Sequence, residues 1–144
     1  MFERYNHSAR RALFYARYEV CTLGGTAIDT EHLLLGLLRV AEGLTARIFA
    51  DADVRFDALR KELQMRSPAR EPLSPSIEIP FGQDTKRILY AAAAESERLG
   101  HDFVGTEHLL LSILREPDTL AAQVLVAKGI SADDVREQIA VFGP

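Results

Sequence analysis

Two copies of a short polar motif offer the most suggestive chemistry in this chain. The sequence TEH stands at 30–32 and again at 106–108, each time directly before a run of leucines. A threonine at a helix start can cap backbone N–H groups, and an acid in the first turn interacts favourably with the helix dipole. The simplest interpretation of each motif is therefore a well-formed helix start.

The same motif could also bind a ligand that carries both charges. Backbone N–H groups at a helix start attract an anion. Glu31 or Glu107 could hold a guanidinium through two hydrogen bonds, and Thr30 or Thr106 would add a hydroxyl donor. A guanidinium that bears a phosphate would match such a site.

Catalytic and metal chemistry have little support in the sequence. Glutamate and histidine are adjacent in each motif, and adjacent helical residues do not face each other as an i, i+4 metal pair does. Lys61, Lys86 and Lys128 are followed by Glu, Arg and Gly, so the phosphate-binding loop of an ATPase is absent. Paired carboxylates of the glycosidase type would require the two motifs to meet face to face. We expect no enzymatic activity, no metal and no cofactor.

The composition narrows the class of protein. The 144 residues are 47% apolar with a net charge of −4, and no basic stripe points to nucleic acid or an anionic membrane. The apolar run at 33–38 is far shorter than the ~20 residues that cross a bilayer. Cys21 is the single cysteine, so we expect a buried structural thiol, no disulfide and a cytoplasmic location.

The second half of the chain repeats the first. The segment DTEHLLLGLLR at 29–39 recurs as GTEHLLLSILR at 105–115, a shift of 76 residues. The same shift pairs Tyr5 with Phe81 and Glu19 with Glu95, and no gap is needed from residue 5 to residue 63. One structural unit was duplicated.

A proline-rich linker separates the copies. We assign repeat one to 1–65, the linker to 66–80 and repeat two to 81–144. Proline blocks helix continuation, so the linker should be partly extended and run over the surface. Two units of this size bury little surface alone, and we expect them to pack as a single domain over 1–144.

Each copy predicts four helices, so the fold class is all-α with about eight helices. Apolar residues at helical spacing run from Ala9 to Leu23, and Gly24-Gly25 ends that helix. Thr30 should cap the second helix, and the third and fourth should cover about 43–51 and about 55–65. The second copy predicts helices at about 83–99, 107–115, 118–128 and 131–141.

With these motifs in place, the chain resembles the Clp N-terminal repeat domain (the double Clp-N motif), closest to the ClpC branch. The resemblance rests on the opening MFERYNHSARRAL, the doubled LG…TEHLLL…LR and the IPF before the second copy. It implies two pseudo-symmetric four-helix repeats that dock adaptor proteins or substrates for an ATP-driven unfoldase with its protease.

The ClpC resemblance also implies particular site residues. Glu31 and Glu107 are implied to recognise phosphoarginine on marked substrates, with Thr30 and Thr106 beside the phosphate. A hydrophobic surface for adaptors and peptide-like molecules is matched by Phe2, Arg10, Phe81 and Lys86.

The two motifs differ in the residues that precede them. The family pattern LGHxxxGTEH survives as LGHDFVGTEH in the second copy, whereas the first reads LGGTAIDTEH. Asp29 puts a negative charge beside the proposed anion pocket and lacks the conformational freedom of glycine. We hypothesise that the second site binds phosphoarginine and that the first is weakened. The residues leave open whether the domain feeds an attached unfoldase or acts as a free-standing scaffold, decoy or adaptor not tied to proteolysis.

Overall fold

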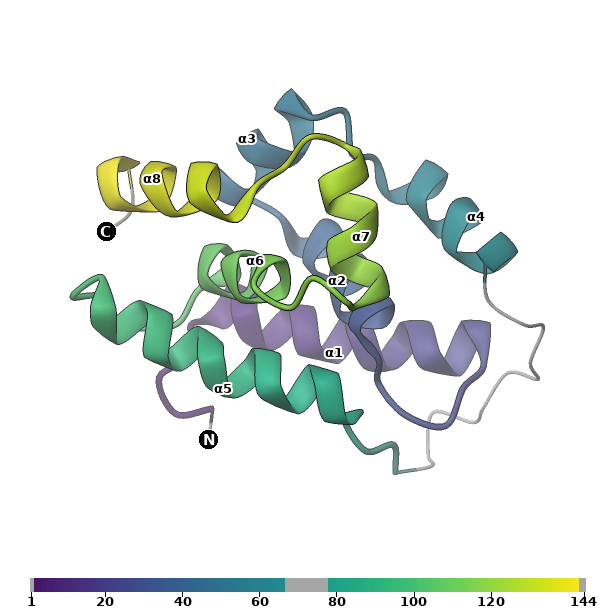
Figure 1. The fold of residues 1–144 in the computed structure, drawn as a ribbon. Helices are drawn as coiled ribbons and strands as arrows, with labels where there is room; N and C mark the ends of the chain where they lie inside the picture. The colour runs from purple at the N-terminus through teal and green to yellow at the C-terminus, as the bar shows by residue number, and fades with distance from the viewer. Residues whose placement is uncertain (1, 67–77, 143–144) are drawn as a thin grey trace.

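The computed structural model describes residues 2–66 and 78–142, and over these stretches the chain forms eight helices (Figure 1). The first half contributes α1 (His7–Leu23), α2 (Thr30–Val40), α3 (Gly43–Asp51) and α4 (Phe56–Arg66). The second half contributes α5 (Gln83–Arg98), α6 (Thr106–Leu114), α7 (Leu120–Ala127) and α8 (Ala132–Phe142). The extended pairing in the described stretches consists of two isolated parallel bridges. The prediction of an all-α fold is confirmed.

The leucine runs of α2 and α6 form the centre of the molecule, with the other helices around them (Figure 1). Their fully buried side chains are Leu33, Leu34, Leu35 and Leu37 of α2 and Leu109, Leu110, Leu111 and Ile113 of α6. One cluster of buried apolar residues draws on both halves of the chain. Because the halves share this core, each covers the apolar face of the other.

The close packing of α2 on α1 depends on a glycine. A Cβ at Gly36 would lie 2.2 Å from the carbonyl oxygen of Ala12, so only a hydrogen fits between the two helices. The second half has Ser112 at the matching position, and its hydroxyl donates to the carbonyl oxygen of Ile88 at 2.7 Å. The equivalent helix contact is therefore made by a glycine in the first half and by a hydrogen-bonded serine in the second.

The repeat appears in three dimensions as a pseudo-twofold exchange. Tyr5 bridges to Val104 and Phe81 bridges to Ile28, and the shift of 76 converts one bridge into the other. In the first bridge, the Val104 carbonyl accepts from the Asn6 N–H at 2.9 Å; in the second, the Ile28 carbonyl accepts from the matching residue's N–H at 3.0 Å. The segment that begins each half thus pairs with the loop before the TEH motif of the other half.

The third helix of each half packs against helices of the other half. α3 contacts α6 and α8, and α7 contacts both α2 and α6. The hydroxyl oxygens of Thr45 in α3 and Thr106 in α6 lie 2.8 Å apart, and the Ala121 N–H of α7 donates to the Thr30 hydroxyl at 3.4 Å. Each TEH helix start is consequently held by a helix from the other repeat.

Two buried glutamates occupy matching positions. Glu19 is fully buried and accepts from Arg60 Nε at 3.1 Å, with Arg39 Nε at 3.7 Å. Its counterpart Glu95 is 1% exposed and lies 2.6 Å from Arg115 Nε. A buried carboxylate requires such partners, because an isolated charge in the interior is strongly unfavourable.

Most of the predicted linker lies outside the described residues. At its end, the Pro80 carbonyl accepts from the Ile28 N–H at 2.8 Å, and Ile79 packs against the small cluster that holds Cys21. Cys21 is 6% exposed, as predicted for a structural thiol.

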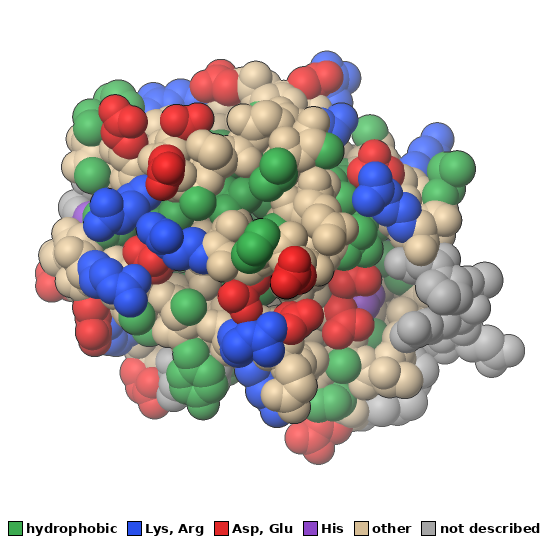
Figure 2. Space-filling view, in the orientation of Figure 1, with side chains coloured by type: hydrophobic (Ala, Val, Ile, Leu, Met, Phe, Trp, Pro, Cys, Tyr) green, Lys and Arg blue, Asp and Glu red, His purple; other side chains and the backbone are tan. Residues whose placement is uncertain are grey.

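Charges of both signs are interspersed on the visible face of the molecule (Figure 2). None of the helices in the described stretches has the length and apolar character that a bilayer crossing requires.

Candidate functional site

The start of α2 forms what we call the first corner, a pocket of about 290 Å³ where α2, α5 and α7 begin. Its lining comprises Asp29, Thr30, Glu31, Gln83, Asp84, Asp118, Thr119 and Leu120. Backbone N–H groups in the first turn of a helix have no partner within that helix. Three helix starts that meet in one place therefore favour negative charge.

The first corner supplies this negative charge from its own side chains. Asp29, Glu31, Asp84 and Asp118 all line the pocket. Figure 2 shows a group of acidic side chains right of centre, over the region where α5 and α7 begin in Figure 1. An anionic ligand would meet four carboxylates there, and like charges at this spacing repel it.

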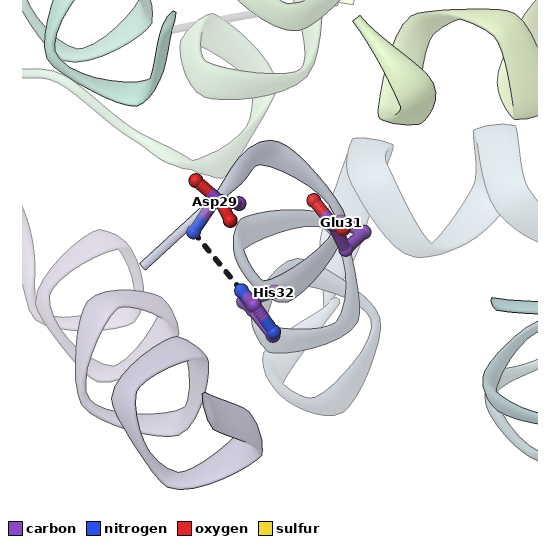
Figure 3. Close-up of side chains that lie close together, drawn as sticks. All are labelled: Asp29, Glu31 and His32. Atoms are coloured by element: carbon purple, nitrogen blue, oxygen red, sulfur yellow. Dashed lines mark hydrogen bonds between the residues drawn. The ribbon is translucent and has the colours of Figure 1, made fainter. Parts of the chain in front are cut away.

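Asp29, Glu31 and His32 gather at this corner, with potential ligand atoms within 4.8 Å of one another (Figure 3). Carboxylates and imidazole are common ligands of divalent cations. The Nδ1 atom of His32, however, accepts a hydrogen bond from the Asp29 N–H at 2.9 Å. This hydrogen bond gives His32 Nδ1 a structural role at the start of α2 and leaves the proton of the neutral ring on Nε2.

The start of α6 forms the second corner, the pseudo-symmetric counterpart where α6, α1 and α3 begin. The Ser8 hydroxyl of α1 donates to the Glu42 carboxylate before α3, and Thr45 of α3 meets Thr106 of α6. Glu107 is the acid in the first turn of α6, and the first turn of α1 has none. The second corner is therefore built from the three equivalent helix starts of the repeat, and it has fewer carboxylates than the first corner.

A glycine and a polar side chain have exchanged places between the corners. A Cβ on Gly105 would lie 1.8 Å from Glu107 Oε1 and 3.2 Å from Asn6 Nδ2. At the first corner the matching residues are Asp29 and Gly82, and a Cβ on Gly82 would lie 2.5 Å from Asp29 Oδ1. Asp29 therefore fits because a glycine lies opposite it, and the Glu107 carboxylate can fold over the backbone because Gly105 has no side chain.

The Glu107 carboxylate is largely shielded from solvent. Its side chain is 16% exposed, and no hydrogen-bond donor from the described residues reaches its buried Oε1 atom. Burial raises the pKa of Glu107, and a backbone hydrogen bond offsets part of that effect. A guanidinium would bring the donors that this carboxylate lacks.

The second corner also contains a pair of histidines. His108 is fully buried, its Nδ1 accepts from the Gly105 N–H at 2.9 Å, and its Nε2 lies 2.8 Å from His101 Nδ1. Burial lowers the pKa of His108 to about 4, with smaller contributions from the charges of His101 and Arg4. Gly25 stands where the first copy would need the counterpart of His101.

The two motif threonines are buried between the repeats. Thr30 and Thr106 are each 4% exposed, and their hydroxyls contact α7 and α3. The prediction that Thr30 caps α2 is wrong, because Asp29 occupies the cap position and Thr30 is the first helical residue. A contact between these hydroxyls and a phosphate stays a prediction.

A separate apolar groove of about 690 Å³ lies along α1 and the segment before α5. It is lined by Phe2, Glu3, Arg10, Leu13, Phe14, Arg17, Ile28, Ile79 and Phe81. The rings of Phe2 and Phe81 meet edge to face at 6.0 Å. The structure thus brings together three of the four predicted surface residues; Lys86 is exposed on α5 and does not line the groove.

Comparison with known proteins identifies the family. Residues 4–128 and 80–142 match the model of the Clp repeat (R) N-terminal domain. The chain belongs to this family. The Clp N-domain is 34% identical over 139 residues to the negative regulator of genetic competence ClpC/MecB of Bacillus subtilis (strain 168), and equally to the chloroplastic chaperone protein ClpC1 of Oryza sativa subsp. japonica. These alignments cover 96% of the chain but only 17% and 15% of the two relatives.

Solved structures show the same fold. The N-terminal domain of the caseinolytic protease associated chaperone ClpD from Arabidopsis thaliana is 26% identical with a TM-score of 0.78, covering 98% of this chain and 97% of that one. A complex of the ClpV N-domain with a VipB peptide has a TM-score of 0.74 at 18% identity, covering 95% and 85% of the two chains. In that complex the ClpV N-domain, and not this chain, holds the VipB peptide.

The sequence analysis did not identify several residues of the first corner and of the apolar groove. Asp84 and Asp118 reach the first corner only because α5 and α7 come from the other repeat. Phe14 and Arg17 lie one helical turn from Arg10 and Leu13 on the same face of α1, and that spacing was the signal that could have found them.

Proposed function

We propose that this Clp N-domain recognises substrates or adaptors for a Clp unfoldase, and that its second corner binds phosphoarginine. The observation that carries the proposal is the buried Oε1 atom of Glu107, which has no donor from the described residues and lies where three helices begin. The guanidinium would pair with this carboxylate, and the phosphate would lie against backbone N–H groups of the helix starts. One corner would therefore recognise both charges of the modified side chain.

The first corner is proposed to bind phosphoarginine weakly or not at all. Glu31 is the counterpart of Glu107, but three further carboxylates, those of Asp29, Asp84 and Asp118, line the same pocket. Repulsion by these carboxylates opposes the anionic half of the ligand. The difference between the two corners thus concerns the phosphate more than the guanidinium.

Calorimetric titration with phosphoarginine tests the assignment. We expect one bound equivalent for the parent domain, loss of binding in Glu107→Gln, and retention in the matched variant Glu31→Gln. Arginine and inorganic phosphate serve as single-charge controls and should each bind more weakly than phosphoarginine. Loss of binding in Glu31→Gln with retention in Glu107→Gln would refute the assignment.

The apolar groove is proposed to hold apolar segments of adaptors or substrates. Phe14 is 65% exposed at the groove, and an exposed aromatic ring beside Phe2 and Phe81 is suited to bury an apolar side chain. Tyr90 is equally exposed on α5 outside the groove and provides a matched control. Binding of a reduced, carboxymethylated model protein should weaken in Phe14→Ala and persist in Tyr90→Ala; equal effects would exclude the groove.

We also propose that the domain associates with a Clp ATPase and its protease in the cytoplasm. The chain aligns with only 17% and 15% of the two ClpC relatives, so their other domains would have to come from a partner or from the rest of a longer chain. Affinity purification from lysate, followed by mass spectrometry, should recover Clp subunits, adaptors or arginine-phosphorylated proteins. Recovery of partners unconnected with proteolysis would instead support a free-standing scaffold, decoy or adaptor.

A further inference from the structure

A short chain of hydrogen bonds fixes the protonation of the two histidines at the second corner. The Gly105 N–H donates to His108 Nδ1 at 2.9 Å, so that nitrogen carries no proton. The proton of the neutral His108 ring is therefore on Nε2, where it donates to His101 Nδ1 at 2.8 Å. The chain is complete when both imidazole rings are neutral.

We propose that His101 is a positioning residue, which holds His108 in the tautomer that anchors Gly105, and that protonation of His101 weakens ligand binding at the second corner. The part that concerns binding rests on the phosphoarginine function proposed above. The part that concerns the tautomer stands on the hydrogen bonds alone.

An added proton must break one of the two hydrogen bonds. If His101 carries protons on both nitrogens, its Nδ1–H faces the Nε2–H of His108 and the 2.8 Å contact becomes repulsive. If His108 then moves its own proton to Nδ1, that proton faces the Gly105 N–H instead. His101 is part-buried and reached by water, whereas His108 is fully buried, so the proton arrives at His101.

The anchor at Gly105 determines where the Glu107 carboxylate lies. A Cβ on Gly105 would come within 1.8 Å of Glu107 Oε1, so the carboxylate rests directly against the Gly105 backbone. The Glu107 Oε1 atom also lies 3.5 Å from His108 Nδ1. Loosening the Gly105 N–H contact therefore displaces the group that is proposed to hold the guanidinium.

Charged side chains of both signs lie beside the histidine pair. Arg4, in the segment before α1, donates to the His101 carbonyl oxygen at 2.8 Å and forms an ion pair with Glu97 of α5 at 3.2 Å. Glu107 faces His108 from the same helix. The positive Arg4 opposes protonation of the pair, and the Glu107 carboxylate favours it.

The first corner provides an internal comparison. His32 Nδ1 accepts from the Asp29 N–H at 2.9 Å, as His108 accepts from Gly105. The residue that matches His101 is Gly25, which has no ring nitrogen to offer. The proposed pH dependence thus belongs to the second corner.

Imidazole nitrogen NMR tests the tautomer directly. The chain has four histidines, and we expect His108 as the Nε2–H tautomer at about pH 8. On acidification, the Gly105 amide resonance should move with the midpoint of His101, and in His101→Leu that movement should disappear. A His108 ring protonated at Nδ1, or a Gly105 amide that ignores the titration of His101, would overturn the proposal.

Phosphoarginine titrations at about pH 8 and about pH 6 test the effect on binding. Asparagine can accept through Oδ1 and does not titrate, so His101→Asn should bind like the parent at the higher pH and lose the pH dependence. On acidification, the parent should lose about two- to tenfold in affinity relative to His101→Asn, which corresponds to the net free energy of one hydrogen bond. His101→Leu should be weaker at both pH values.

His32, at the first corner, supplies the control for a general effect of histidine charge. Asparagine can accept from the Asp29 N–H in its place, so His32→Asn should keep the pH dependence of the parent, and its loss there would overturn the role given to His101. Failure of phosphoarginine to bind at any pH would refute the proposed function, whereas the NMR titration decides the role of His101 without any ligand.

Discussion

Replacing Gly105 with alanine should separate ligand binding from folding. The new Cβ would lie 1.8 Å from Glu107 Oε1 and 3.2 Å from Asn6 Nδ2, and no backbone atom is among its nearest neighbours. The backbone at Gly105, with φ −109°, suits alanine as well as glycine. The flexible Glu107 carboxylate must therefore swing out toward solvent, and we expect the free energy of unfolding to change by about 1 kcal/mol or less.

Binding should respond much more strongly than stability. A hydrogen bond to a charged group contributes about 1.5–3 kcal/mol, and displacing the Glu107 carboxylate removes at least one such bond to the guanidinium. The affinity of Gly105→Ala for phosphoarginine should therefore fall about 10- to 150-fold. Calorimetric titration measures the affinity, and urea denaturation of the same sample measures the stability.

Gly82→Ala is the matched control at the first corner. Its Cβ would press on Asp29 Oδ1 at 2.5 Å, again on the end of a side chain, so the substitution perturbs the corresponding place in the other repeat. Phosphoarginine binding should be unchanged. The reasoning fails if Gly105→Ala binds like the parent domain, or if it unfolds so readily that the loss of binding follows from loss of structure.

Three further predictions concern stability. Gly36→Ala should lower the free energy of unfolding in urea by about 1–3 kcal/mol, because the Cβ meets the Ala12 carbonyl oxygen at 2.2 Å; an unchanged midpoint would contradict this close approach. Arg60→Ala should lower the free energy of unfolding by about 3 kcal/mol, since it leaves the fully buried Glu19 carboxylate with Arg39 at 3.7 Å, and adding Glu19→Gln should recover part of that loss in thermal melts. The pKa of His108 is lowered to about 4, so the unfolded chain takes up a proton that the folded one refuses, and stability should fall as pH decreases from about 6.5 toward about 4. Urea midpoints measured across that range should fall less steeply in His108→Asn than in the parent domain.

The local features of the fold could be predicted from the sequence. The helical spacing of apolar residues and the glycines after Leu23 predicted α1, and the leucine run after Thr30 predicted α2. Both depend on interactions within a few residues, which periodicity and capping preferences describe. The internal repeat then fixed the second half by analogy, and the matched bridges at Tyr5 and Phe81 bear this out.

The make-up of the corners could not be predicted in this way. Asp84 reaches the start of α2 because the two halves interlock, and no local pattern records which helix of one repeat meets which helix of the other. The burial of Thr30 has the same origin, since α7 covers a hydroxyl that local preferences would expose as a cap. Asp29 stood out in the sequence as a departure, but its accommodation by Gly82 became visible only in three dimensions.

Interlocking also explains how one fold can hold two unlike sites. The first corner takes α2 from one repeat and α5 and α7 from the other, and the second corner takes α6 with α1 and α3. Two separate identical repeats in this arrangement would necessarily have two identical corners. Once both repeats are in one chain, Asp29 and Gly82 can change together while Gly105 and Asn6 stay as they are, because the two pairs are encoded separately. The acidic first corner and the second corner with its fewer carboxylates are therefore independent of each other in sequence, although the helices that build them share one core.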